Sequence, residues 1–237
     1  MFKELHIESS PKRIRVLFAG HFVADTKQAK LVWLKPSYPY YFFEEGVIDK
    51  KYLIEAFHSE KHQVYDLVVA TTHAKGVVTQ YLEGELKGLF NIEFGAPDAW
   101  FEEDEQIYVH PKDPYKRVDV LQSSRHIRIE LDGVELANTK RPRLLFETSL
   151  PVRSYIPKTD CHLELFESSK LTTQCPYKGV ANYYSIKLPN GRVAEDIVWY
   201  YRTPLLECAE VKGCVAFYDE KVDVYVDGVL QRRPGSG

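Results

Sequence analysis

The sequence predicts a mainly β protein: two tandem antiparallel sheet domains with few short helices. Apolar and polar residues alternate over residues 127–131 and 222–226, which is the period of two expected for half-buried strands. Asp-Gly pairs at 132–133 and 227–228 follow these runs directly and indicate tight hairpin turns. Helical periodicity is weak, and its best stretch is residues 49–57.

A repeated order of short matches divides the chain into two copies. Residues 12–33 match residues 125–146, and the series continues with Lys75-Gly76 on Lys178-Gly179. Three later matches are Ala99-Trp100-Phe101 on Val198-Trp199-Tyr200, Val118-Asp119-Val120 on Val222-Asp223-Val224, and Thr72 and Tyr41 at the places of Cys175 and Arg153. Repeats are sought first because they fix the architecture. We expect domains at 1–121 and 122–230, an insertion in the first near 44–68, and a disordered tail over 231–237.

Composition argues against several classes of protein. The net charge of −3 gives no case for nucleic acid or an anionic membrane as partner. Apolar runs are far too short to span a bilayer, and the N-terminus shows no secretory signal. The four cysteines form no C-x-x-C pair, so we expect no structural zinc, no disulfide scaffold and a cytoplasmic location. No Gly-rich nucleotide loop is present, and we expect no cofactor. The oligomeric state stays open.

The segment with the most residues suited to binding or catalysis is Thr173-Gln174-Cys175-Pro176-Tyr177-Lys178-Gly179. Gly allows a tight turn, Pro fixes its approach, and Lys178 could hold an acidic ligand group, with Tyr177 beside it in the pocket wall. A nearby cation would make Cys175 more nucleophilic. The alternative is a structural turn with a buried thiol and a solvated lysine.

Further candidates lie on the expected strands of the second copy. Arg153 and Tyr155 are two residues apart and share a face, so Arg153 could bind a carboxylate or phosphate or form an ion pair with Glu135, Glu147 or Glu164. Tyr184 and Trp199 could line the pocket or pack in the core. Glu195 is a candidate acid or base, or a partner of Arg192 or Arg202. We interpret Asp219, Asp223 and Asp227 as a solvated strand face rather than a metal site.

The second copy resembles the family of domains of unknown function numbered 427. The resemblance rests on Arg153-Ser154-Tyr155-Ile156-Pro157, on 173–179 with Ala181 and Tyr184, on 194–201 with Pro204, and on 213–218 with 222–228. The first copy resembles it more weakly, and tandem copies are similar to fungal members. The resemblance implies a β-tent fold, with two antiparallel sheets meeting at an angle around a small pocket. Relatives of this fold often carry zinc, but the paired cysteines are absent here.

These observations lead to one functional hypothesis and one alternative. The first is a cytoplasmic small-molecule-binding protein, which could be an enzyme, with its pocket in the second copy. Arg153 and Lys178 would bind an anionic or carbonyl group, and Tyr155, Tyr177, Tyr184 and Trp199 would line the apolar part. Cys175, Lys178 and Glu195 are the candidate catalytic residues. The alternative is a protein-interaction module with a vestigial pocket.

Overall fold

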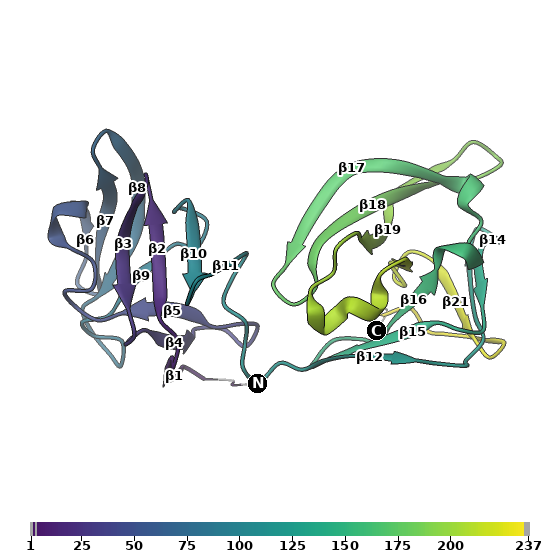
Figure 1. Ribbon diagram of the computed structural model, residues 1–237, viewed down its shortest axis with the longest axis horizontal. Helices are drawn as coiled ribbons and strands as arrows, with labels where there is room; N and C mark the ends of the chain where they lie inside the picture. Colours follow the sequence, from purple (N-terminus) through teal and green to yellow (C-terminus); the bar gives the residue numbers. More distant parts are fainter. Residues whose placement is uncertain (1, 3, 235–237) are drawn as a thin grey trace. The chain divides into compact units, whose positions relative to one another are not determined.

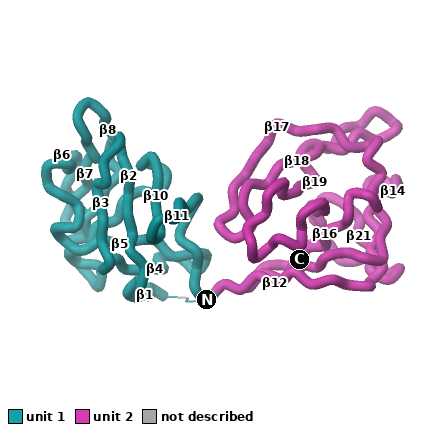
Figure 2. The backbone as a smooth tube through the Cα atoms, viewed as in Figure 1, with its two compact units in different colours: residues 1–115 teal, residues 116–237 magenta. Residues whose placement is uncertain are grey.

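The computed structural model describes residue 2 and residues 4–234, and the chain divides into two compact units. Unit 1 contains residues 1–115 and unit 2 contains residues 116–237 (Figure 2). The division lies before the expected boundary at 121 because residues 118–122 form a strand of the second unit's sheet. No helix among the described residues has the length and apolar character needed to cross a membrane.

Unit 1 is built from two antiparallel sheets (Figure 1). Its strands are β1 (His6–Ser9), β2 (Ile14–Phe18), β3 (His21–Thr26), β4 (Lys30–Trp33), β5 (Tyr40–Phe43), β6 (Leu53–His58), β7 (His62–Val69), β8 (Thr72–Tyr81), β9 (Phe90–Ile92), β10 (Ala99–Glu102) and β11 (Glu105–Ile107). The seven-stranded sheet has the order β1-β4-β5-β9-β8-β7-β6, and the four-stranded sheet the order β11-β10-β2-β3. The 3₁₀ turn η1 (Lys50–Tyr52) precedes β6.

Unit 2 repeats this arrangement (Figure 1). Its strands are β12 (Val118–Gln122), β13 (Ile127–Leu131), β14 (Val134–Thr139), β15 (Arg143–Glu147), β16 (Arg153–Pro157), β17 (Phe166–Cys175), β18 (Gly179–Lys187), β19 (Val193–Tyr201), β20 (Cys214–Phe217), β21 (Asp223–Val226) and β22 (Val229–Leu230). The 3₁₀ turns are η2 (Lys158–Asp160), η3 (Leu163–Leu165) and η4 (Leu206–Val211). The sheet orders are β12-β15-β16-β20-β19-β18-β17 and β14-β13-β21-β22.

The two units have the same strand order, so each predicted match between the two copies can be compared with the strands that are equivalent in the structure. It confirms the matches over residues 12–33 and 125–146, which pair β2, β3 and β4 with β13, β14 and β15. The later matches are wrong. Lys75 and Gly76 lie in β8, whose counterpart is β19, whereas Lys178 lies in the turn between β17 and β18. Trp100 in β10 likewise corresponds to a position in β21 and not to Trp199 in β19.

Three other expectations of local structure need correction. Residues 49–57 form a 3₁₀ turn and part of a strand instead of a helix. Residues 44–68 are not an insertion, because β6 and β7 have counterparts in β17 and β18. The tail is ordered as far as the description reaches: Gln231 donates a backbone hydrogen bond to Val224, and Arg233 forms an ion pair with Asp223. Residues 235–237 lie outside the described part.

Alternation along the strands gives the large sheet of unit 2 two buried faces. Ile156, Val198 and Val215 face the four-stranded sheet and pack with Ile127 and Ile129. Their neighbours in sequence, Tyr155, Trp199 and Ala216, form a second apolar cluster on the opposite face, together with Leu145 of β15 and with Cys208 and Val211 of η4. We call these the inner face and the outer face of the sheet. Burial on both faces explains why β19 ends in the continuous apolar run 197–201.

Candidate functional site

A cavity of about 230 Å³ lies on the outer face of the large sheet in unit 2. We call it the outer pocket. Strands β15, β16, β18 and β19 place alternate side chains into it, because residues two apart on a strand share a face. The lining residues are Leu145, Glu147, Leu150, Pro151, Arg153, Tyr155, Lys178, Tyr183, Trp199, Tyr201 and Tyr218.

Aromatic rings form the floor of the outer pocket. The indole Nε1 of Trp199 donates a hydrogen bond of 3.0 Å to the hydroxyl of Tyr155, and the two rings meet edge to face at 88°. Burial raises the pKa of Tyr155 above its usual value, so the hydroxyl stays protonated at neutral pH. The floor is therefore aromatic, neutral and internally hydrogen bonded, which suits a ring or an apolar chain.

Two lysines share one carboxylate at one side of the pocket. Glu147 forms an ion pair with Lys178 and another, at 3.1 Å, with Lys116. The side chains of Glu147, Lys178 and Lys116 are only 6%, 11% and 13% exposed. Burial raises the pKa of Glu147, but the hydrogen bonds and charges of Lys178 and Lys116 outweigh it and leave the pKa below its usual value. The cluster thus holds two cations and one anion, with a net positive charge.

Arg153 occupies another part of the same wall. Its guanidinium group lies 5.7 Å from the ring centre of Trp199 and is bound by Asp219 at 3.1 Å and Glu220 at 2.5 Å. These partners differ from the three glutamates considered from the sequence. Burial raises the pKa of Asp219 to about 6, although the charge of Arg153 acts in the opposite direction. Arg153 is thus already paired with two carboxylates and is a poorer anion receptor than the lysine cluster.

The structure brings four of the sequence-predicted residues together: Arg153, Tyr155, Lys178 and Trp199 all line the outer pocket. Tyr184 does not, because it points to the inner face, where it stacks on Tyr200 and accepts a 3.0 Å hydrogen bond from Lys158. Tyr177 lies in the turn with its side chain buried, and its carbonyl oxygen accepts a hydrogen bond from the Cys208 thiol.

The candidate catalytic residues do not meet in one site. The Cys175 sulfur lies 3.8 Å from the Lys178 Nζ but does not line the outer pocket. Glu195 is exposed and lines a separate shallow hollow with Arg192 and Lys221. Asp219, Asp223 and Asp227 are also separate, bound to Arg153, Arg233 and the backbone N–H of His126 respectively. Within residues 2 and 4–234, no group of three His, Cys, Asp or Glu side chains is placed to hold a metal ion; metal independence stays a prediction.

Gly179 fixes the turn that presents Lys178. Its φ is +99°, and an added Cβ would lie 3.3 Å from the carbonyl oxygen of Thr203. The backbone carbonyl of Lys178 in turn accepts a 3.1 Å hydrogen bond from Leu205. Glycine is needed here both for the positive φ and for the close approach of a second chain segment.

We expect Gly179→Ala to lower the free energy of unfolding by about 1–3 kcal/mol, because strain at a positive φ and a tight backbone contact act together. Gly76→Ala is the matched control: its φ is +66°, and its Cβ would meet only Val64 at 3.9 Å. Urea unfolding of both variants measures the difference. An equal loss in the two would mean that the contact with Thr203 contributes nothing.

In unit 1, tyrosine and phenylalanine take the places of Arg153 and Tyr155. Strand register puts Tyr40 where unit 2 has Arg153, since each faces the matching residue of the preceding strand, Val32 or Leu145. By the same register Phe42 corresponds to Tyr155 and Tyr41 to Ser154, which corrects the predicted match of Tyr41 with Arg153. Phe42 packs with Val32 and Leu86 in a small apolar cluster. Unit 1 therefore has a tyrosine where unit 2 has the guanidinium group of Arg153.

Several residues of the outer pocket and of its lysine cluster had no signal of their own in the sequence. Lys116 lies before the expected domain boundary, and Glu147 was considered only as a partner of Arg153. Tyr183 and Tyr201 could have been found by period two, because they share the outer face with Ala181 and Trp199. Tyr218 lies in the segment after β20, and only the fold brings it to the pocket.

Comparison with known families agrees with the repeat. A family model described as a domain of unknown function, DUF427, matches residues 6–87 and again residues 119–228. The two matched segments cover most of the chain and fall one in each structural unit. No curated protein matches the sequence.

Proposed function

We propose that this chain, which belongs to the DUF427 family as a tandem two-copy member, is a small-molecule-binding protein whose ligand occupies the outer pocket of unit 2. The ligand combines an anionic or carbonyl group with an apolar or aromatic part. We place the protein in the cytoplasm, in keeping with its four free cysteines, and assign it no cofactor.

The lysine cluster carries this proposal. Two nearly buried ammonium groups share the single carboxylate of Glu147, and no second carboxylate pairs with either lysine in the part of the chain described. A buried net charge is costly unless it gains a partner. An anionic ligand group beside Lys178 would supply that partner, while the ring of Trp199 and its neighbours would take the apolar part.

A defined probe tests the proposal. Phenylacetate combines a carboxylate with one ring, and we expect it to raise the melting temperature of the full chain in a saturable way. Lys178→Met should weaken its binding roughly ten- to a hundred-fold, since a hydrogen bond to a charged group is worth about 1.5–3 kcal/mol. Isothermal titration calorimetry measures the change.

Two controls complete the design. Lys187→Met removes an exposed lysine whose partner is Glu167 and should leave binding unchanged. Phenylacetamide, with a carbonyl in place of the carboxylate, should bind more weakly than phenylacetate. If neither probe nor a wider set of metabolites binds unit 2, the alternative of a protein-interaction module with a vestigial pocket replaces the proposal.

A further inference from the structure

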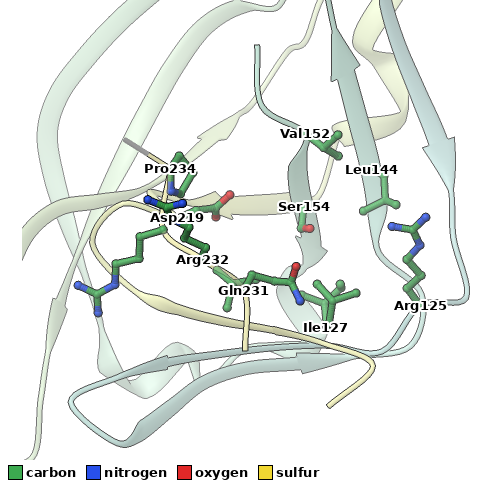
Figure 3. Close-up of a pocket in the computed structure, with 12 residues that line it drawn as sticks. Arg125, Ile127, Leu144, Val152, Ser154, Asp219, Gln231, Arg232 and Pro234 are labelled. Atoms are coloured by element: carbon green, nitrogen blue, oxygen red, sulfur yellow. The ribbon is translucent and has the colours of Figure 1, made fainter. Parts of the chain in front are cut away.

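A second cavity of unit 2 lies on the opposite, inner face of the large sheet. It has a volume of about 230 Å³ and is enclosed by β13, β15, β16, β21 and residues 231–234. We call it the inner pocket. Its floor is apolar, with side chains that include Ile127, Leu144 and Val224, and Figure 3 shows Ser154 and Asp219 among the side chains that surround the space.

The strand register shows which residues of unit 1 take the places of those around the inner pocket. Ser154 faces Leu144 across β15 and β16, and Tyr41 faces the equivalent Leu31 across β4 and β5. Val224 faces Ile129, and Trp100 faces the equivalent Val16. Unit 1 thus has Tyr41 and Trp100 where unit 2 has a serine and a valine.

The two rings fill the space in unit 1. Tyr41 and Trp100 are 3% and 2% exposed, and their ring centres lie 6.3 Å apart in a stacked arrangement. The Tyr41 hydroxyl donates a hydrogen bond of 2.8 Å to Glu102. The first unit therefore carries a phenol inside its own core, with its hydroxyl on a carboxylate.

The inner pocket of unit 2 combines its apolar floor with polar side chains, among them Asp219 and three arginines, Arg125, Arg232 and Arg233. Replacing tyrosine and tryptophan by serine and valine removes most of two rings, and a void of this kind loses the contacts of its lining. A carboxyl group is again present, that of Asp219, whose side chain is only 18% exposed. We propose that the inner pocket binds a small phenolic molecule, whose ring rests on the apolar floor and whose hydroxyl donates to Asp219.

This inference is independent of the proposed function, because the two pockets lie on opposite faces of the sheet. The probe is 4-methylphenol, which has the chemistry of a tyrosine side chain. In methyl-labelled full-length protein, we expect saturable NMR shifts at Ile127, Leu144 and Val224 of the inner pocket. Leu145 and Leu150 of the outer pocket should shift less, because Asp219 reaches that pocket only through Arg153. Absence of saturable shifts at the inner methyl groups overturns the proposal, and so does an effect centred on the outer pocket.

Two variants rebuild the arrangement of unit 1. Ser154→Tyr and Val224→Trp each place a ring in the inner pocket, and each should weaken binding of 4-methylphenol at least tenfold. Ser154→Ala is the control, which should bind within about threefold of the native chain. If Ser154→Tyr does not fold, the affinity of Val224→Trp for 4-methylphenol and the methyl shifts of the native chain still test the proposal. Unchanged affinity in a folded ring-bearing variant contradicts the proposal.

The hydroxyl group has its own test. Toluene has the same ring and methyl group without the donor, so we expect it to bind at least about threefold more weakly than 4-methylphenol, the effect of one hydrogen bond of modest strength. Equal affinities would show that the pocket selects only for shape, which would overturn the assignment of Asp219 as acceptor.

Discussion

Glu147→Gln should be among the most destabilising single substitutions in unit 2, with an expected loss of about 3 kcal/mol in the free energy of unfolding. The change removes the carboxylate that pairs with both Lys116 and Lys178 and leaves two ammonium groups in a site where each side chain is less than 15% exposed. An unpaired buried charge costs several times more than a surface ion pair contributes. Denaturant unfolding at neutral pH measures the loss.

The matched control is Glu167→Gln. Its partner Lys187 lies at 3.3 Å, and both side chains are about half exposed, so a loss below about 1 kcal/mol is expected. Adding Lys178→Met to Glu147→Gln should recover part of the stability, because one of the two unpaired cations is removed. If Glu147→Gln costs no more than the control, the lysine cluster is better solvated than its burial indicates, and the case for an anionic ligand group weakens with it.

Asp219→Asn should instead stabilise the protein at pH 7.5. Burial raises the pKa of Asp219 to about 6 in the folded state, above its ordinary value of 3.8. Between pH 3.8 and about pH 6 the folded chain binds more protons than the unfolded chain, so the stability of the native protein decreases as pH rises through this range. The asparagine variant lacks this titration and should be up to about 3 kcal/mol more stable than the native chain at pH 7.5.

The comparison at low pH gives the control for that prediction. At pH 4 the carboxyl group is protonated in the folded state, so the two proteins should differ little. Glu195→Gln removes an exposed carboxylate and should leave the pH dependence as it is in the native chain. A variant that loses stability at pH 7.5 would show that the ion pair with Arg153 outweighs the cost of burying the charge.

The sequence predicted the strands well because their signals are local. Period two, β-branched residues and Asp-Gly turns are read within a few residues, and each appears where the structure has a strand or hairpin, as at β13 and β14. The weak helical pattern over residues 49–57 failed because the chain there completes a sheet, and pairing of β6 with β7 outweighs local preference.

The later repeat matches failed for a different physical reason. Strands of one sheet protein share the same alternation, so Val-Asp-Val in β12 resembles Val-Asp-Val at β21 without occupying the same place. Only the stretch from β2 to β4 preserves turn positions as well as alternation. The turn of Lys178 therefore had no true partner in Lys75, and the comparison that matters is between equivalent strand positions.

The site could be predicted only in part. Arg153 and Tyr155 are two apart on one strand, and that local relation placed both on the outer face. Partners distant in sequence, such as Glu147 for Lys178 and Asp219 for Arg153, depend on which strands become neighbours. Tyr184 was misplaced because its neighbour Tyr183 is the residue that pairs with Trp199, so Tyr184 lies on the opposite face of the sheet. The register between β18 and β19 decides which tyrosine shares a face with Trp199, and that register could not be assigned without the fold.

Asp219 connects the two cavities of unit 2: it lines the inner pocket and binds Arg153, which lines the outer pocket. A change in the protonation of Asp219, or in the group to which it is hydrogen bonded, therefore affects both cavities. A molecule that draws Arg153 away from Asp219 on one face of the sheet changes what Asp219 offers on the other. Linkage then requires reciprocity: whatever factor the first occupant applies to the affinity of the second, the second applies to the first. If both pockets bind the ligands proposed for them, this single aspartate would make the two sites cooperative or antagonistic, and pH would act on both.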